Sequence, residues 1–252
     1  MLLVVGAVPV AYRFSPQARV LMLSAAGRNP VCPLPLALQA QAMIDEHIAT
    51  MARISAASRV IRTDGDLELW QTPAGEYWIP KGAKSSNHQG GGDTLSSILA
   101  ESQRRIYGKG ETGVKPADIV IDGGAHVGTF TRQSIQDGAS LVIAVEPSPK
   151  NVECLRRNLE KEIAAGKVIV YTKGVWDTET TLAFHVDDES TARDTIVEGP
   201  AGKGDILVPV TTIDRLAEEL KLPRVDFIKM DIEGSERRAL AGARTTIGKF
   251  KP

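Results

Sequence analysis

The stretch from Asp118 to Phe130, "DIVIDGGAHVGTF", constrains the fold more than any other part of the chain. It is an apolar run that ends on the carboxylate of Asp122 and then breaks into glycine at Gly123, Gly124 and Gly128. A continuous apolar run is typical of a strand buried on both faces, and glycine permits a tight turn into a following helix. The stretch therefore predicts a strand, turn and helix of a parallel sheet, where the backbone can approach a ligand.

The chain after this unit continues to alternate short apolar runs with helical patterns. Helical spacing recurs up to Gly138, from Ser148 to near Gly166, from Thr212, and around Leu240, Ala243 and Ile247. The apolar runs are "LVIAVE", "KVIVYTKGV", "TLAFHV", "DILVPV" and "VDFIKMD". This alternation predicts an α/β fold with a doubly wound, mostly parallel, Rossmann-like sheet covered on both faces. Because no full helix separates "TLAFHV" from "DILVPV", we expect these two runs to form a local antiparallel pair.

The chain divides into three segments by pattern. Residues 1–35 form an apolar segment, which we expect to be irregular. Residues 36–115 are expected to form an N-terminal extension: a helix from Leu36 to Ser58, a hairpin around Pro73-Ala74-Gly75, a glycine-rich loop, and a helix from Thr94 to Tyr107 that Asp93 caps. Residues 116–252 are expected to form the main domain.

Composition narrows the function classes. The 252 residues carry a net charge of -1 and a pI near 6.5, which gives no reason to expect nucleic acid as a partner. Cys32 and Cys154 lack the spacing of a disulfide framework or zinc site and read as ordinary thiols. Arginines at positions 13, 19 and 28 interrupt the apolar N-terminus before it reaches membrane-spanning length, so we expect no membrane span and a cytoplasmic location.

A second carboxylate suggests the kind of ligand. In "VIAVEPSP", Glu146 ends an apolar run 24 positions after Asp122, the usual position of an acid that binds a ribose diol. Together with freed backbone N–H groups in the glycine turn, it predicts a ligand of the adenosine type. The spelling "GGAHVG" matches a dinucleotide fingerprint poorly, because Ala125 stands where a glycine belongs. The alternative is that a tight strand-to-helix turn needs glycine for structural reasons alone.

Four charged residues gather at the end of a later apolar run, in "DFIKMDIEGSE". They are Lys229, Asp231, Glu233 and Glu236. Buried charge is costly unless it is paired or used, so the three acids are candidates for the base that a hydroxyl acceptor needs. The alternative is that Lys229 pairs with a nearby carboxylate and Glu236 only opens the following helix. Such acids could also bind magnesium or calcium, but helix-start acids more often satisfy backbone donors, and we predict no metal site.

Several motifs resemble, in this order, the FkbM family of S-adenosylmethionine-dependent methyltransferases. They are "VIDGGAHVGTFT", "VEPSPKNVECLRRNL", "GVWD", "VPVTTIDRL" and "VDFIKMDIEGSERRALAGA", preceded by "EYWIP" and "ILAESQRRIY". The resemblance implies the class I methyltransferase fold and S-adenosylmethionine as the cofactor. It also implies contacts of the cofactor with the turn, with the end of the second strand and with the residue after the third strand: Asp122, Gly123, Gly124, Ala125, Gly128, Glu146, Pro147 and Asp177.

The chain departs from the family pattern in two places. His126 stands where the family often carries asparagine; it is either a packed helix-start residue or a further candidate for the catalytic base. The C-terminal "GKFKP" stops where the next core strand would begin, so we expect a C-terminally truncated domain that lacks its last strands. The strand from Val225 to Met230 would then be an exposed sheet edge, through which the chain could aggregate or form a homo-oligomer.

The expected function is methyl transfer to oxygen, on a hydroxyl of a sugar or secondary metabolite. The acceptor is accordingly a small molecule or a glycan. A second hypothesis, from a different class, is a truncated, catalytically inactive module that binds the cofactor or a partner. A third hypothesis is an NAD-dependent oxidoreductase. The sequence of the glycine turn argues against it.

Overall fold

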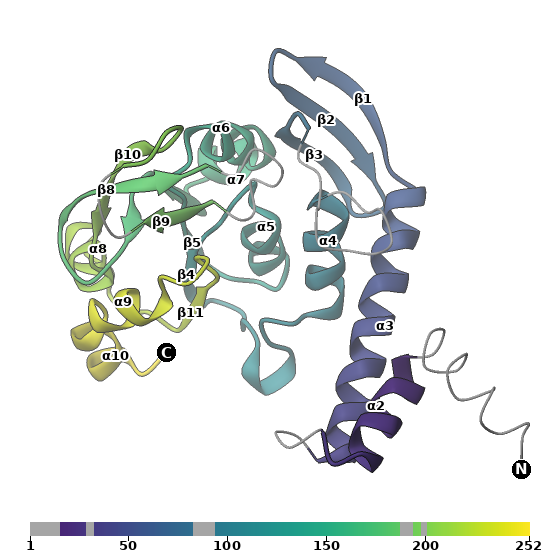
Figure 1. Ribbon diagram of the computed structural model, residues 1–252. Coiled ribbons are helices and arrows are strands. Elements are labelled where there is room, and N and C mark those ends of the chain that lie inside the picture. Colours follow the sequence, from purple (N-terminus) through teal and green to yellow (C-terminus); the bar gives the residue numbers. More distant parts are fainter. Residues whose placement is uncertain (1–15, 29–32, 83–93, 187–193, 198–200) are drawn as a thin grey trace, which may run out of the picture. The chain divides into compact units, whose positions relative to one another are not determined.

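The computed structural model describes residues 16–28, 33–82, 94–186, 194–197 and 201–252 (Figure 1). Cys32 and the glycine-rich loop with Asp93 lie outside this described part. The chain divides into two compact units, one that ends at Thr50 and one that runs from Met51 to Pro252. The second unit contains both the parallel sheet and most of the expected N-terminal extension.

Two helices account for the described residues of the first unit. Helix α3, Leu34–Ala56, which continues into the second unit, confirms the helix expected from Leu36 to Ser58. Helix α2, Pro16–Ala25, lies in the segment expected to be irregular. It forms because "PQARVLMLSA" places proline at the first helical position and then strong helix formers. No helix in the described ranges combines the length and the apolar character that a membrane span requires.

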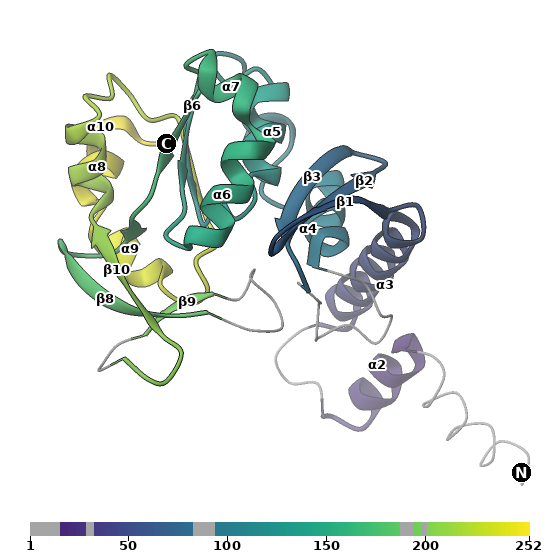
Figure 2. The ribbon, with the colours of Figure 1, turned by 90° about the horizontal axis from the view of Figure 1, so that it is seen from above.

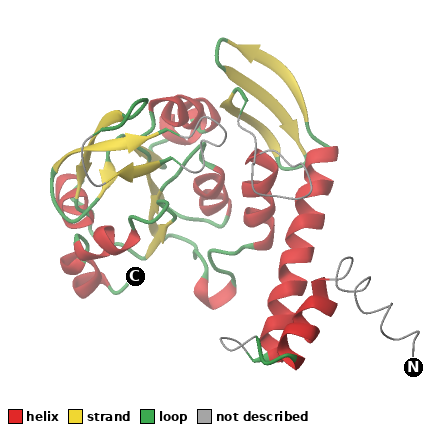
Figure 3. Cartoon of the chain, in the orientation of Figure 1, coloured by secondary structure: helices red, strands yellow, loops and turns green. Residues whose placement is uncertain are grey.

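The expected hairpin is part of a three-stranded antiparallel sheet (Figure 3). Strands β2, Leu67–Thr72, and β3, Gly75–Pro80, pair around the predicted turn, where Thr72 Oγ1 accepts the N–H of Ala74 at 3.1 Å. Strand β1, Arg59–Asp64, was not predicted. Its six residues are all exposed, so it lacks the alternation of buried and exposed positions that marks a strand.

A four-stranded parallel sheet forms the centre of the second unit. Its strands are β4, Ile119–Gly123; β5, Leu141–Val145; β6, Val168–Tyr171; and β11, Phe227–Met230. Their order is β11-β4-β5-β6, and every neighbouring pair is parallel. The doubly wound, Rossmann-like α/β prediction is therefore confirmed. In the described part of the chain, β11 is an edge strand of this sheet.

Helices cover both faces of the parallel sheet, as predicted (Figure 2). One layer contains α5, Thr129–Gln136; α6, Pro149–Asn158; and α7, Glu160–Ala164. The other contains α8, Ile213–Glu219; α9, Glu236–Ala241; and α10, Arg244–Phe250. Successive residues of β4 enter different cores: Val120 packs with Leu155 and the first layer, whereas Ile121 packs with Leu216 and the second.

Two predicted elements are each divided in the structure. The run "KVIVYTKGV" supplies β6 and also β7, Gly174–Val175, which belongs to a different sheet. The single last helix is broken into α9 and α10 at Gly242. A Cβ atom on Gly242 would lie 2.2 Å from the carbonyl oxygen of Trp176, so only glycine fits where these two backbones meet.

The second sheet has the order β7-β10-β8-β9. Strands β8, Thr180–His185, and β10, Ile206–Thr211, form the antiparallel pair that was predicted, and β9, Thr195–Val197, extends it. Strand β7 joins β10 in parallel register, with Thr211 opposite Val175. The sheet thereby brings Phe184 of β8 and Ile196 of β9 close to the carboxyl ends of the parallel strands, where both line a pocket.

The N-terminal hairpin packs against helix α6 of the main domain. Asn158, at the end of α6, accepts the N–H of Trp78 at 2.6 Å and donates to the carbonyls of Trp78 and Val127 at 2.9 and 2.8 Å. The buried core here joins Leu95 and Leu99 of α4, Thr94–Arg104, to Cys154 of α6. Burial raises the pKa of the Cys154 thiol to about 12, which fits an unreactive core residue.

Candidate active site

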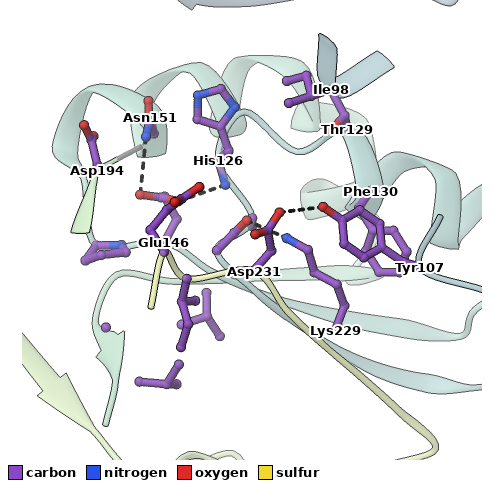
Figure 4. A pocket seen from close by; sticks show the side chains of 18 of the residues that line it. Ile98, Tyr107, His126, Thr129, Phe130, Glu146, Asn151, Asp194, Lys229 and Asp231 are labelled. Atoms are coloured by element: carbon purple, nitrogen blue, oxygen red, sulfur yellow. Dashed lines mark hydrogen bonds between the residues drawn. The ribbon is translucent and has the colours of Figure 1, made fainter. Parts of the chain in front are cut away.

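A pocket opens at the carboxyl ends of β4, β5 and β11, where a ligand of an open α/β sheet is expected (Figure 4). It encloses about 830 Å³ of empty space, a volume that includes open solvent. Four regions line it: the glycine turn after β4, the end of β5, the residues after β11, and a wall from α4 and the second sheet. The sequence placed the first three regions at this edge, whereas the fourth was not foreseen.

The glycine turn has the shape that packing requires. Gly124 adopts a φ of +73°, and a Cβ atom there would lie 2.0 Å from the carbonyl oxygen of Asp231. Gly128 adopts a φ of +88°, and a Cβ atom would lie 2.8 Å from Cδ1 of Leu159. Backbone conformation and close packing are therefore sufficient to explain these two glycines, as the structural alternative held. Gly124 and Ala125 nevertheless line the pocket, whereas Gly123 and Gly128 are not among the lining residues.

The backbone donors of the turn are used within the protein. The N–H groups of Gly124 and Ala125 both donate to the carbonyl oxygen of Val145 at 3.0 Å. The N–H of His126 donates to Oε2 of Glu146 at 2.8 Å. The expectation that freed N–H groups here meet the ligand is therefore not supported for these three positions.

Asp122 supports the turn from below and does not line the pocket. Its side chain is fully buried; Thr131 Oγ1 donates to Oδ2 at 2.6 Å, and Nζ of Lys229 lies 3.3 Å from Oδ1. Lys229 also donates to the carbonyls of Gly123 and Gly124 at 3.2 and 2.8 Å. Asp122 is therefore not among the residues that line the pocket. It forms an ion pair with Lys229, as the structural alternative for Lys229 predicted.

Glu146 lines the pocket, as does Pro147, and its side chain is almost completely buried. Its Oε1 accepts the N–H of Ser148 at 2.9 Å and lies 3.5 Å from Nδ2 of Asn151, while Oε2 accepts from His126 (Figure 4). Burial raises the pKa of this carboxyl to about 7, although the two backbone donors oppose the shift. The carboxylate is thereby held rigidly at the end of β5 and faces the pocket.

His126 lines the pocket, but its imidazole is a weak base. Burial lowers the pKa of the ring to about 3, and the nearby ammonium of Lys229 lowers it further in the same direction. The imidazole is therefore neutral at physiological pH. Its backbone has a φ of 52° and serves the turn by donating to Glu146. These features fit the packed turn residue better than the catalytic base.

The acids after β11 take different positions. Asp231 and Glu233 line the pocket, and the hydroxyl of Tyr107 donates to Oδ2 of Asp231 at 2.5 Å (Figure 4). Glu236 is not a lining residue; its Oε1 accepts the N–H groups of Ile232 and Gly234 at 3.1 and 3.3 Å. Glu236 therefore begins α9 and accepts hydrogen bonds from the backbone of the preceding loop. This agrees with the alternative that Glu236 only opens the following helix.

Asp177 also lies outside the pocket lining. Its Oδ2 accepts from Nη1 of Arg238 at 2.8 Å, and this pair joins the loop after β7 to helix α9. The region that the resemblance assigned to adenine is lined instead by the apolar side chains of Val175, Phe184 and Ile196. Asp177, which was expected to contact adenine, is therefore not among the residues that line the pocket.

Several lining residues were missed by sequence reasoning, above all Glu101 of α4 and Tyr107 after it. Burial raises the pKa of Glu101 to about 7, and the neighbouring carboxylate of Asp231 adds to the shift. The available signal was the spacing of Ile98, Glu101 and Ser102, which places all three on one helix face. From the sequence alone, a single glutamate on an amphipathic helix is expected to face solvent. Only the packing of α4 shows that Glu101 faces the pocket.

Comparisons with known proteins find similarity to methyltransferases. Residues 122–252 match the family model described as the methyltransferase FkbM domain. The chain is 26% identical over 192 residues to the 31-O-demethyl-FK506 methyltransferase FkbM of Streptomyces tacrolimicus, covering 65% of this chain and 74% of that protein. It is 25% identical over 130 residues to the hexuronic acid methyltransferase AglP of Haloferax volcanii, covering 52% of each.

A solved structure also shows similarity. The crystal structure of methyltransferase FkbM from Methylobacillus flagellatus is 26% identical in sequence, with a TM-score of 0.40. The match covers 54% of this chain and 31% of that one. The chain thus spans about half the length of one curated relative and less than a third of this solved relative.

Proposed function

We propose that this chain, which belongs to the FkbM methyltransferase family, transfers the methyl group of S-adenosylmethionine to a hydroxyl of a small-molecule or glycan acceptor. The family match covers the strand ends that build the pocket. Two relatives are named for methylating 31-O-demethyl-FK506 and a hexuronic acid, which supports an oxygen-bearing acceptor.

The observation that carries the proposal is the buried carboxyl of Glu146 at the end of β5. It faces the pocket from the position where an acid binds the ribose diol of a nucleoside. Two backbone N–H groups hold it in place, so its orientation does not depend on a bound ligand. This placement supports an adenosine-containing cofactor more directly than the glycines do.

The chemistry of the lining residues fits S-adenosylmethionine. Glu101, Asp231 and Glu233 make one side of the pocket acidic, which suits a donor that carries a positively charged sulfonium and an ammonium group. Val175, Phe184 and Ile196 provide an apolar wall against which an adenine ring can pack. In this arrangement Glu146 and Pro147 would hold the ribose, and Gly124 and Ala125 would lie beside the methionine end.

The cofactor, when bound, supplies an electrophilic methyl group. The residues of the chain then have three tasks: to align the acceptor oxygen with that methyl group, to exclude water, and to take the proton of the hydroxyl. Asp231 and Glu233 are close enough to the pocket to contribute to the third task, whereas Glu236 is committed to backbone donors. The neutral imidazole of His126 is a poor candidate for it.

Calorimetric titration with S-adenosylmethionine, S-adenosylhomocysteine and NAD tests the cofactor. We expect binding of the first two and none of NAD; binding of NAD alone would favour the oxidoreductase hypothesis. Methyl transfer to a panel of methyl glycosides, followed by mass spectrometry, then tests the reaction. Binding without transfer to any acceptor would favour the inactive cofactor-binding module.

A further inference from the structure

One wall of the pocket lies outside the segment that matches the family. The match begins at Asp122, whereas Ile98, Glu101, Ser102 and Tyr107 line the pocket from α4 and the turn after it. This wall is attached firmly to the domain: Gln133 of α5 donates to the carbonyl oxygen of Ser102 at 3.1 Å. The family domain and the N-terminal extension therefore build the pocket together.

The hydroxyl of Tyr107 interacts with two carboxyl groups that line the pocket, those of Asp231 and Glu101. The hydroxyl donates its proton to Oδ2 of Asp231 at 2.5 Å and also interacts with the carboxyl of Glu101. The interaction with Tyr107 favours the charged form of Glu101 and so opposes the rise in pKa that burial causes. Glu101 thus lies in the pocket wall near a carboxylate that already accepts a hydrogen bond from Tyr107.

The ammonium of Lys229 lowers the pKa of Glu101, but by less than burial and the carboxylate of Asp231 raise it. The same ammonium donates to the carbonyls of Gly123 and Gly124 and lies 3.3 Å from Oδ1 of Asp122. The other charged group that faces Glu101 is Glu233, a further acid. Glu101 is therefore partly buried among acids, so it gains and loses a proton close to neutral pH, with a pKa of about 7.

The other titratable groups of the wall are less suited to accept a proton at that pH. Burial and the bond to Asp231 raise the pKa of Tyr107 far above its usual value, so the phenol stays protonated. The pKa of about 3 leaves His126 a weak base. A general base is most effective when its proton affinity matches the working pH, and Glu101 meets that condition.

We propose that Glu101 is the catalytic base that takes the proton of the acceptor hydroxyl, and that Tyr107 and Asp231 are its positioning residues. The assignment rests on the proposed methyl transfer from S-adenosylmethionine. The acceptor oxygen forms a bond to the methyl carbon as the bond from that carbon to sulfur breaks, which leaves a neutral thioether. The hydroxyl proton passes to the Glu101 carboxylate and from there to solvent.

The test compares Glu101→Gln with Glu111→Gln, since the Glu111 side chain is 99% exposed and serves as a matched control. Cofactor affinity is measured by titration with S-adenosylhomocysteine, and turnover is measured at saturating S-adenosylmethionine with methyl glycosides as acceptors. We expect Glu101→Gln to lower kcat about 10²- to 10⁴-fold while affinity for S-adenosylhomocysteine stays within about twofold. Glu111→Gln should change neither quantity.

Two further readouts separate catalysis from structure. In ¹³C NMR of labelled glutamate carboxyls, two titrations are expected near pH 7, those of Glu101 and Glu146. One of them should be absent in Glu101→Gln, and both should be present in Glu111→Gln. In the wild type, kcat should rise with pH near pH 7, as Glu101 loses its proton. Tyr107→Phe should shift the pH at which this rise occurs. An unchanged profile in Glu101→Gln would overturn the assignment and leave the proposed function intact.

The remaining outcomes are also decisive. If the wild type binds neither S-adenosylmethionine nor S-adenosylhomocysteine, the proposed function fails and the assignment of Glu101 fails with it. If the wild type binds both but methylates none of the glycosides, the chain behaves as a cofactor-binding module and the catalytic role of Glu101 is overturned. Loss of kcat in Glu101→Gln with cofactor affinity retained supports the assignment.

Discussion

Nζ of Lys229 lies 3.3 Å from Oδ1 of Asp122, and both side chains are buried beneath the glycine turn. The two residues are also neighbours in strand register, because Lys229 of β11 pairs with Asp122 of β4. The same ammonium donates to the carbonyls of Gly123 and Gly124. One buried charge pair therefore joins two strands and fixes the backbone that forms the floor of the pocket.

Replacing Asp122 with asparagine should be strongly destabilising. The substitution leaves the buried ammonium of Lys229 without its counter-charge, and loss of one partner from such a pair costs about 3 kcal/mol or more. Asp137→Asn is the control, because its partner Arg105 is 44% exposed and the pair should contribute less than about 1 kcal/mol. Urea denaturation measures both; equal losses would contradict a special role for the buried pair.

Gly124→Ala and Gly166→Ala separate backbone strain from steric overlap. Both glycines have nearly the same φ, +73° and +70°, but only at Gly124 would a Cβ atom meet the backbone, 2.0 Å from the oxygen of Asp231. Gly166→Ala should cost about 1 kcal/mol, from the left-handed conformation alone. Gly124→Ala should cost several times more or prevent folding, as measured by soluble yield and urea midpoint. Similar effects would show that the turn can move away from β11.

Glu146→Gln should weaken cofactor binding without unfolding the chain. The amide keeps the size of the side chain but loses the charge, and one of its ends can no longer accept the N–H of His126 or Ser148. We expect the dissociation constant for S-adenosylhomocysteine to rise at least about tenfold, as for a lost hydrogen bond to a charged group. Glu160→Gln, at an exposed position, is the control. Unchanged affinity would remove the ribose assignment.

Stability should fall as pH rises from about 4.5 to about 7. Glu101 and Glu146 both have a folded-state pKa of about 7, raised by burial from 4.5, so these two groups bind more protons in the folded than in the unfolded chain between these values. His126, whose pKa is lowered from 6.5 to about 3, has the opposite effect up to about pH 6.5, but it is one group against two. Each glutamate lowers the free energy of unfolding by at most about 1.4 kcal/mol per pH unit in that window. Urea denaturation from pH 4.5 to 8 measures the slope. It should be shallower in Glu101→Gln, and an unaltered slope would contradict the shift.

Asn158→Ala should loosen the N-terminal hairpin. The side chain makes three hydrogen bonds, to both backbone groups of Trp78 and to the carbonyl of Val127, so their loss should cost about 2 to 4 kcal/mol. Asn158→Asp should be similarly destabilising, because a carboxylate cannot donate to the two carbonyls. Hydrogen exchange at the amide of Trp78 gives a local measurement. Protection that is unchanged in both variants would show that other contacts hold the hairpin.

Local patterns were sufficient to predict most of the fold. Continuous apolar runs identified the strands of the parallel sheet, and 3.6-residue spacing identified the helices that cover it, because both signals lie within a few neighbouring residues. The predictions failed where distant segments decide the outcome. Strand β1 is wholly exposed and has no pattern of its own, and the helix break lies at Gly242, where the backbone of Trp176, 66 positions away, leaves no room for a side chain.

The candidate site shows the same division. Glu146 was identified correctly as a residue of the pocket, because it follows directly on the last residue of β5. Asp122 was placed in the pocket too, but its carboxyl is held below the turn by Thr131 and Lys229. Side chains alternate between the faces of a strand. The sequence near Asp122 does not show which residues contact each face.

By itself, the sequence determined the alternation of strands and helices, the glycine turn after β4 and the presence of acids at two strand ends. Only the tertiary structure decided that Glu101 and Tyr107 of the N-terminal extension enter the pocket and that Lys229 is paired with Asp122. The physical reason is the range of the interactions. Backbone shape and periodicity depend on adjacent residues, whereas burial, charge pairing and proton affinity depend on groups that lie more than a hundred residues apart in the chain.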